Sequence, residues 1–271
     1  MTFQAVSVLG IPLDFNSSHL TGAAEAPPII HKILHNGSAN LSSESGVDIG
    51  KDNRLTDAGM LTWPDQTSAF PCIQQRAAEV YSAGHKLLSI GGDHSITYPL
   101  VKGLQEQRQP LTILHFDAHP DLYDELLGNR HSHACPFARI MEEQLADRLI
   151  QVGIRTLNAH QRQQAEKFGV EVHEMRHWQG ALSLDIKGPV YISIDLDALD
   201  PAFAPGVSHH EPGGLTVREV LTILQQLDAP VIGADIVEYN PSRDINDMTA
   251  MVCAKLYKEL AALLLKDCQQ S

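Results

Sequence analysis

Residues 111–121, LTILHFDAHPD, combine the two features that decide the fold. A mainly apolar run without polar alternation, typical of a strand buried on both faces, is followed at once by Asp117, His119 and Asp121. Strands without polar alternation are typical of parallel sheets covered by helices on both faces. Ligands of such sheets bind beyond the carboxyl ends of the strands. The stretch therefore predicts both a fold class and the place of a functional site.

The same pattern of short apolar runs and amphipathic segments extends along the chain. We expect strands at residues 6–13, 86–90, 111–116, 149–154, 170–175, 190–196 and 231–237. We expect helices at residues 27–35, 70–83, 95–107, 136–146, 159–168, 216–227 and 247–265. This alternation predicts an α/β fold with one parallel sheet. Residues 37–67, which are poor in periodic apolar positions, are predicted to be a long surface excursion within one domain, residues 1–271.

Composition excludes several classes of protein. The 271 residues carry 33 acidic and 20 basic side chains, a net charge of −13, whereas a nucleic-acid partner requires a basic stripe. No apolar run approaches the ~18 residues that cross a membrane, and the first residues lack the pattern of a secretory signal. The four cysteines contain no CxxC pair, which argues against a disulfide framework. We therefore expect a cytoplasmic protein with no nucleic-acid or membrane partner.

Charged residues follow four of the predicted strands. His94 follows the second predicted strand, Asp195 and Asp197 lie at the end of the sixth, and Glu238 follows the last. One such residue is usually a helix cap. The set is different, because Asp117, Asp121, Asp195 and Asp197 at one sheet edge repel one another unless cations neutralise them.

Two divalent ions would balance these four carboxylates. Residues i and i+2 of a strand point the same way, so Asp117 with His119, and Asp195 with Asp197, form pairs of ligands on one side. Together with His94 and His119, the four carboxylates form a ligand set too rich in oxygen for a structural zinc site. Such a set favours a harder ion, Mn²⁺ first. Two such ions lower the pKa of a shared water and generate hydroxide, so the predicted chemistry is hydrolysis.

A second group of residues suggests the substrate. His133 lies near the predicted helix start at Pro136 and is either a proton donor to a leaving amine or a solvated loop residue. Glu238 is either a clamp for a planar guanidinium, through paired charge-assisted hydrogen bonds, or a helix cap. Cys135 is either a thiol that affects activity or, with more weight, a buried and inert residue.

The motifs GGDHS at residues 91–95, DAHPD at 117–121 and SIDLDALDP at 193–201 resemble the three signatures of the ureohydrolase (arginase/agmatinase) family. Residues 10–28, 132–142, 204–215 and 233–244 most resemble plant-type arginases and their bacterial relatives. The resemblance thus extends over nearly the whole chain. It implies a three-layer α-β-α arginase-like fold with a mostly parallel eight-stranded sheet, assembled into a homotrimer or homohexamer.

The resemblance also implies a role for each residue of the site. One Mn²⁺ would be held by His94, Asp117, Asp121 and Asp195, and the other by Asp117, His119, Asp195 and Asp197. His133 matches the family's proton-transfer histidine and Glu238 its guanidinium-binding glutamate, and we group both with Asp121 as catalytic residues. The expected activity is hydrolysis of a small cationic guanidino substrate to urea and an amine.

At the contacts to the tail of the substrate, this chain departs from animal arginases. Where animal arginases carry Asn, Asp and Thr, this chain carries Tyr123, Asn158 and His209. We expect Asn158 and His209 to bind substrate together with His133 and Glu238. L-arginine is the first choice, and agmatine or another guanidino or formimino compound such as formiminoglutamate is the alternative.

Two other classes of protein are to be distinguished from a ureohydrolase. Two-metal phosphoesterases also carry Asp-x-His motifs, but their Gly-Asn-His-Asp segment is absent from this sequence. A binding protein without catalysis would have no need for four mutually repelling carboxylates.

Overall fold

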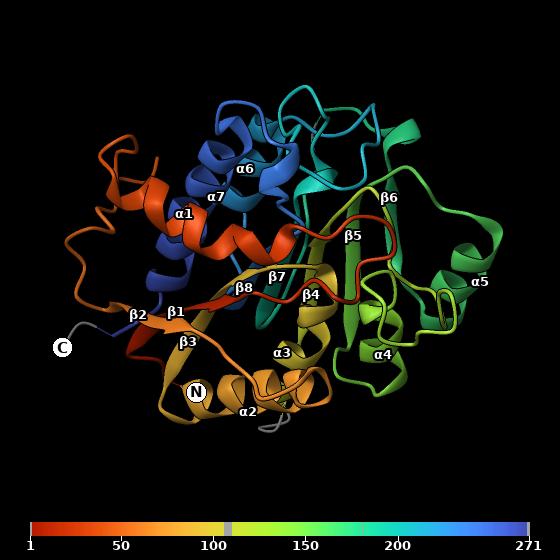
Figure 1. The fold of residues 1–271 in the computed structure, drawn as a ribbon, viewed down its shortest axis with the longest axis horizontal. Coiled ribbons are helices and arrows are strands. Elements are labelled where there is room, and N and C mark those ends of the chain that lie inside the picture. Colours follow the sequence, from red (N-terminus) through yellow and green to blue (C-terminus); the bar gives the residue numbers. More distant parts are fainter. Residues whose placement is uncertain (1, 106–109, 181, 270–271) are drawn as a thin grey trace.

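The computed structural model describes residues 2–105, 110–180 and 182–269. Its strands are β1 (Ala5–Ile11), β2 (Leu55–Met60), β3 (His85–Gly91), β4 (Thr112–Phe116), β5 (Arg148–Ile154), β6 (Glu171–Glu174), β7 (Val190–Asp195) and β8 (Val231–Val237). They form one eight-stranded sheet in the order β2-β1-β3-β8-β7-β4-β5-β6, and every neighbouring pair is parallel (Figure 1). This single sheet supports the proposal that the chain is one domain.

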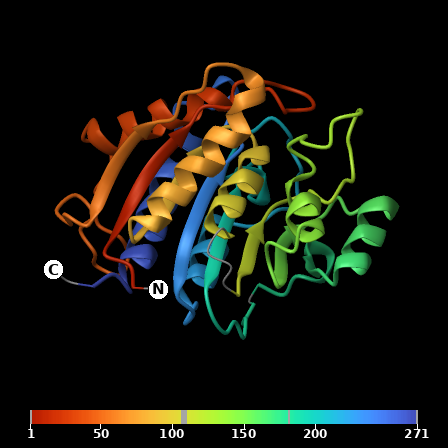
Figure 2. The ribbon, with the colours of Figure 1, turned by 90° about the horizontal axis from the view of Figure 1, so that it is seen from below.

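Helices cover both faces of the sheet. They are α1 (Ala26–His35), α2 (Ala69–Ser82), α3 (Thr97–Leu104), α4 (Pro136–Glu142), α5 (Ala159–Phe168), α6 (Val217–Gln225) and α7 (Met248–Leu265). On one face α7 packs against α1 and α6, and on the other α3 packs against α2 and α4 (Figures 1 and 2). The expected three-layer α-β-α fold is therefore confirmed.

The central strands are buried because both of their faces are covered. Every residue of β4, β7 and β8 is buried, and so is every residue of β3 after His85. These are strands whose sequences are mainly apolar without regular polar alternation, as is typical of burial on both faces. Among the described residues, no helix has both the length and the apolar character needed to cross a membrane.

One strand was missed by the sequence prediction. Strand β2 lies within residues 37–67, which we had predicted to be a surface excursion. It is an edge strand, paired only with β1, and its residues Leu55–Met60 are exposed or half-buried. The sequence of β2, LTDAGM, lacks the apolar run by which the other strands were found, in keeping with its exposure.

The predicted helices occur, with shifted ends. The segment expected at residues 95–107 begins as a 3₁₀ turn, His94–Ile96, and continues as α3 to Leu104, and residues 106–107 lie outside the described part. The segment expected at residues 136–146 ends four residues early, because α4 stops at Glu142.

The order of the strands positions the site. Strands β3, β8, β7 and β4 are neighbours at the centre of the sheet, although they are distant in sequence. Their carboxyl ends therefore bring residues 91–95, 238, 195–197 and 117–121 to one edge. In a parallel sheet this is the edge at which ligands bind.

Candidate metal centre and active site

The segment after β3 directs His94 towards this edge. Gly92 lies so close to the preceding loop that a Cβ atom there would be 1.8 Å from the carbonyl oxygen of Leu13. Asp93 caps the 3₁₀ turn that follows by accepting a hydrogen bond of 3.0 Å from the amide of Ser95. Only glycine permits the approach, and the cap fixes the turn from which the His94 side chain projects.

Two site residues have strained backbones. Asp121, after β4, has a φ of 51°, and Glu238, directly after β8, has a φ of 64°. L-residues seldom adopt this left-handed conformation, and it concentrates at functional sites, where the surrounding structure enforces it. Both residues are buried.

A first cluster surrounds Nδ1 of His94. This atom lies 3.2 Å from Oδ2 of Asp117, 3.0 Å from Oδ2 of Asp121 and 3.2 Å from Oδ2 of Asp195. All four side chains are buried. Within the described residues Nδ1 of His94 nevertheless has no hydrogen-bond partner. Three carboxylates and an imidazole nitrogen thus converge on one point.

The other nitrogen of His94 explains this arrangement. Nε2 lies 2.9 Å from Oγ of Ser193, and that hydroxyl donates a hydrogen bond of 2.6 Å to Asp235. Because the hydroxyl hydrogen is used on Asp235, the Ser193 oxygen accepts from Nε2–H of His94. The lone pair of neutral His94 therefore lies on Nδ1 and faces the three carboxylates. Only a cation can make such a point favourable.

A second cluster surrounds Nδ1 of His119. This atom lies 3.0 Å from Oδ2 of Asp197 and 3.3 Å from Oδ1 of Asp117. Asp117 therefore presents one oxygen to each cluster, as a carboxylate that bridges two ions would. The loop of Asp197 is held to that of Asp195, whose Oδ1 accepts the Asp197 amide at 2.8 Å.

The pKa values show how strongly the chain requires positive charge here. Burial and the carboxylates of Asp197 and Asp117 raise the pKa of Asp195 well above its ordinary value. Burial raises the pKa of Asp197 to about 6, and Asp117 adds to the shift although His119 opposes it. Burial by itself would lower the pKa of His94, but the carboxylates around it raise it well above its usual range. Without another cation, bound protons supply the positive charge that these carboxylates require.

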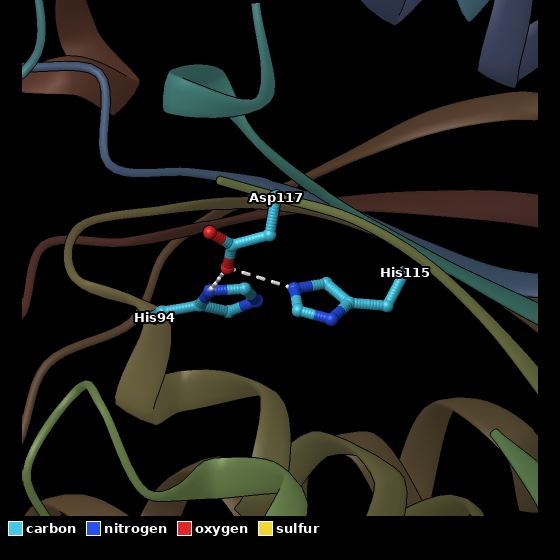
Figure 3. Close-up of side chains that lie close together, drawn as sticks. All are labelled: His94, His115 and Asp117. Carbon is cyan, nitrogen blue, oxygen red and sulfur yellow. Dashed lines mark hydrogen bonds and ion pairs between the residues drawn. The ribbon is translucent and has the colours of Figure 1, made fainter. Parts of the chain in front are cut away.

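The donors fit divalent ions. Adjacent ligands of an octahedral ion with bonds of about 2.1 Å lie about 3 Å apart, which is the spacing seen around both imidazoles. Two sets of residues have ligand atoms close enough together to share an ion: Asp117, His119 and Asp197, and His94, His115 and Asp117 (Figure 3). The site therefore fits the expected pair of ions, with carboxylate oxygen as the main donor.

His115 was missed by the sequence prediction. It lies two residues before Asp117 on β4, and its Nε2 is 2.8 Å from Oδ2 of Asp117. The two-residue spacing that paired Asp117 with His119 also places His115 on the same side, and this signal could have identified it.

A hydrogen-bonded pair borders the clusters. Nδ1 of His133 lies 2.8 Å from Oε1 of Glu238, and the amide of His94 donates a hydrogen bond of 2.9 Å to the same oxygen. Burial opposes the charge on His133, but the carboxylate of Glu238 prevails and raises the pKa of His133 to about 9. On its other side, Nε2 of His133 lies 2.8 Å from Oγ of Ser18, a contact that the sequence did not indicate.

The two residues expected at the substrate tail lie in different surroundings. The ring centre of His209 lies 5.5 Å from that of His133, 5.8 Å from that of His119 and 5.5 Å from that of His19, which the sequence analysis had not singled out. Asn158 is exposed, caps α5 by accepting from the Gln161 amide, and donates to the hydroxyl of Tyr123. These two hydrogen bonds join Asn158 to Tyr123 and to the start of α5, and neither partner is a ligand of the clusters.

The structure thus brings together the six expected ligands, His133, Glu238 and His209. Asn158 lies apart from them, on the exposed rim of the site at the start of α5. Their roles remain predictions. Cys135 is buried, as expected, and burial raises its pKa to about 12, so its thiol is protonated at neutral pH.

Comparison with known proteins identifies relatives along nearly the whole chain. The model of the arginase family matches residues 4–262. "Arginase 1, mitochondrial" of Arabidopsis thaliana is 48% identical over 97% of this chain and 82% of its own length. "Arginase 2, chloroplastic/mitochondrial" of the same plant is 47% identical over 96% of this chain and 80% of its own. The solved structure of arginase from Medicago truncatula, 43% identical, superposes with a TM-score of 0.89 over 96% of this chain and 87% of its own.

These relatives overturn the expected cytoplasmic location. Their names place the two Arabidopsis proteins in mitochondria or chloroplasts and not in the cytoplasm. The cysteine content on which the expectation depended excludes a disulfide framework only. It does not distinguish the cytoplasm from other compartments in which thiols stay reduced.

The resemblance to plant-type arginases that the motifs suggested is confirmed by these matches. Fold and sequence agree over more than nine-tenths of the chain. The chain belongs to the arginase family, whose members are hydrolases that act on guanidino carbon–nitrogen bonds.

Proposed function

We propose that the protein is a manganese-dependent arginase, which hydrolyses L-arginine to L-ornithine and urea. The observation that carries the proposal is the pair of carboxylate clusters around Nδ1 of His94 and Nδ1 of His119, with the Glu238–His133 pair beside them. The arginases of Arabidopsis, at 47–48% identity, support arginine as the substrate.

The six expected ligands would hold two Mn²⁺ ions. His94, Asp117, Asp121 and Asp195 would hold one, and Asp117, His119, Asp195 and Asp197 the other. Four carboxylates with two imidazoles favour Mn²⁺ over a tetrahedral structural zinc. When bound, the ions supply Lewis-acid chemistry that lowers the pKa of water towards neutrality.

Glu238 is the proposed clamp for the guanidinium group. Burial would raise its pKa, but the charge and the hydrogen bond of His133 lower it, so the carboxylate is ionised at neutral pH. A buried carboxylate beside a planar guanidinium makes short, charge-assisted hydrogen bonds with two nitrogens. Binding would orient the guanidinium plane and leave its central carbon open to attack by water.

His133 is the proposed proton donor. It lies 2.8 Å from Glu238 and therefore beside any guanidinium held by that residue. Its raised pKa, about 9, favours the protonated form at neutral pH. When the bond between the guanidinium carbon and the side-chain nitrogen breaks, that nitrogen takes a proton from His133. The products are then urea and an amine.

His209 is the proposed contact for the tail of the substrate. Its Nε2 is buried and has no hydrogen-bond partner among the described residues, although its ring faces His133 and His119. An unpaired buried polar group is costly unless a ligand satisfies it. The α-carboxylate of arginine would accept such a bond, whereas agmatine has no carboxylate. Asn158, on the rim, is the second proposed contact.

The test is urea release from L-arginine and from agmatine, measured side by side after incubation with Mn²⁺ and after chelation. We expect urea from arginine, little from agmatine, and about two manganese ions per chain in elemental analysis. Urea from agmatine alone would refute the substrate and leave the reaction class standing. Absence of urea from both, with fewer than two ions bound, would refute the whole proposal.

We further propose that residues 1–271 form one domain and that the chain assembles as a homotrimer or homohexamer. The assembly rests on the resemblance of the motifs to arginases. Light scattering should give three or six times the chain mass of 29.7 kDa. A mass equal to one chain would contradict it.

A further inference from the structure

We infer that His115 is a positioning residue for the bridging carboxylate of Asp117 and is not a metal ligand, although its ring lies within reach of the proposed ions. Gln151, on the neighbouring strand β5, would fix the tautomer that makes this possible. The inference rests on the proposed function, because it concerns how the proposed metal site is held.

The contacts form a short chain across two strands. Nε2 of His115 lies 2.8 Å from Oδ2 of Asp117, and Figure 3 marks this contact with a dashed line. On the far side of the ring, Nδ1 of His115 lies 3.1 Å from Nε2 of Gln151. The same Gln151 nitrogen donates a hydrogen bond of 2.6 Å to the carbonyl oxygen of Pro120. His115, Asp117 and Gln151 are all fully buried.

The carbonyl of Pro120 decides which way the Gln151 amide faces. A carbonyl oxygen only accepts, so the Gln151 atom 2.6 Å from it is the NH₂ group and not the oxygen. The second hydrogen of that NH₂ group is then available to Nδ1 of His115. In this orientation Nδ1 is the acceptor, and the proton of the neutral ring lies on Nε2.

Both nitrogens of His115 are then occupied. Nε2–H donates to Asp117, and the lone pair of Nδ1 accepts from Gln151. A metal ion requires a free lone pair on an imidazole nitrogen, and none remains. In this arrangement His115 cannot be a ligand without breaking one of the two hydrogen bonds.

The ring has little freedom to turn away. Its centre lies 4.0 Å from that of Phe137 and 5.0 Å from that of His94. Nε2–H of His115 therefore holds Oδ2 of Asp117 at 3.2 Å from Nδ1 of His94. Because the other oxygen of Asp117 faces His119, this one hydrogen bond positions a carboxylate shared by both clusters.

Hydrogen bonds to ligating groups typically contribute about 10–100-fold to metal affinity. The test compares manganese binding in His115→Leu, which removes the donor, with His115→Gln, whose amide can still donate. Gln151→Met removes the group that fixes the tautomer and leaves His115 in place. His85→Gln, at the opposite end of β3 where His85 contacts Ser7, is the matched control for a His-to-Gln change in this sheet.

Two quantities are measured for each purified protein: ions bound at saturating Mn²⁺, by elemental analysis, and the dissociation constant for Mn²⁺, by competition with a chelator. We expect two ions in every variant. Affinity should fall about 10–100-fold in His115→Leu, less in Gln151→Met, and least in His115→Gln, with His85→Gln equal to wild type.

A loss of one ion at saturation in His115→Leu would show that His115 is a ligand, and it would overturn the inference. Affinity equal to wild type in both His115→Leu and Gln151→Met would overturn it as well. If His115→Leu does not fold, Gln151→Met alone decides, because it leaves the imidazole in place. Fewer than two ions in the wild-type protein would instead refute the proposed function.

Discussion

Replacing Glu238 by glutamine should separate substrate binding from metal binding. The substitution keeps the size of the side chain and an oxygen that can accept from the amide of His94 and from Nδ1 of His133. It removes the negative charge that would face the guanidinium, and its NH₂ group would face the NH₂ groups of the substrate. We therefore expect activity to fall with little change in stability or metal content.

The magnitude follows from the two hydrogen bonds proposed between Glu238 and the guanidinium. A hydrogen bond to a charged group contributes about 1.5–3 kcal/mol, against about 0.5–1.5 kcal/mol for a neutral one. Removing the charge of Glu238 therefore weakens the two hydrogen bonds by roughly 2–3 kcal/mol in total. The contact between the NH₂ group of the glutamine and an NH₂ group of the substrate costs about 1 kcal/mol more. Since about 1.4 kcal/mol corresponds to tenfold, kcat/KM should fall about 100-fold to 1,000-fold.

The assay is urea release by Glu238→Gln over a range of L-arginine concentrations, with manganese content measured on the same samples. Glu219→Gln is a suitable control, because Glu219 is a carboxylate that caps α6 and contacts Trp178. A fall of less than tenfold in Glu238→Gln would refute the clamp. Loss of manganese together with activity would mean that Glu238 belongs to the metal site.

Three further outcomes test the site. Asp197→Ala and His119→Ala should each abolish urea release and lower the melting temperature in the presence of Mn²⁺, and retained turnover in both would contradict the ligand assignment. His133→Ala should reduce turnover while the bound manganese stays unchanged, whereas equal loss of metal would make His133 a ligand. Burial raises the folded-state pKa of Asp195 and of Asp197, the latter to about 6. Their contribution to stability is therefore present at low pH and lost as the pH rises through those pKa values. Protein freed of metal by a chelator should then melt at a lower temperature at about pH 7 than at about pH 5. Added Mn²⁺ should remove this difference. If the melting temperature of the chelated protein instead rises from about pH 5 to about pH 7, the carboxylates do not repel one another as proposed.

Much of the fold could be predicted because burial on both faces leaves a clear pattern. The runs that became β4, β7 and β8 are mainly apolar and do not alternate with polar residues, and each ends close to its predicted position. Strand β2 left no such pattern, since its residues are exposed or half-buried and backbone pairing with β1 places it in the sheet.

The candidate site divides in the same way. Ligands that end strands, such as Asp117 and Asp195, could be found because charge after an apolar run is conspicuous. His115 was hidden within such a run, although it contacts Asp117. Ser18 and His19 come from a loop whose path depends on tertiary packing, and no local pattern places that loop beside His133 and His209.

The separation of the ligand clusters from Asn158 has an evolutionary consequence. The clusters stand on central strand ends, where a change disturbs buried neighbours, while Asn158 lies on an exposed connection ahead of α5. Mutations in such a connection are tolerated more readily than mutations in the interior. Proteins that evolve from this one can therefore acquire new guanidino substrates through mutations in exposed connections, while the residues that carry out hydrolysis stay unchanged.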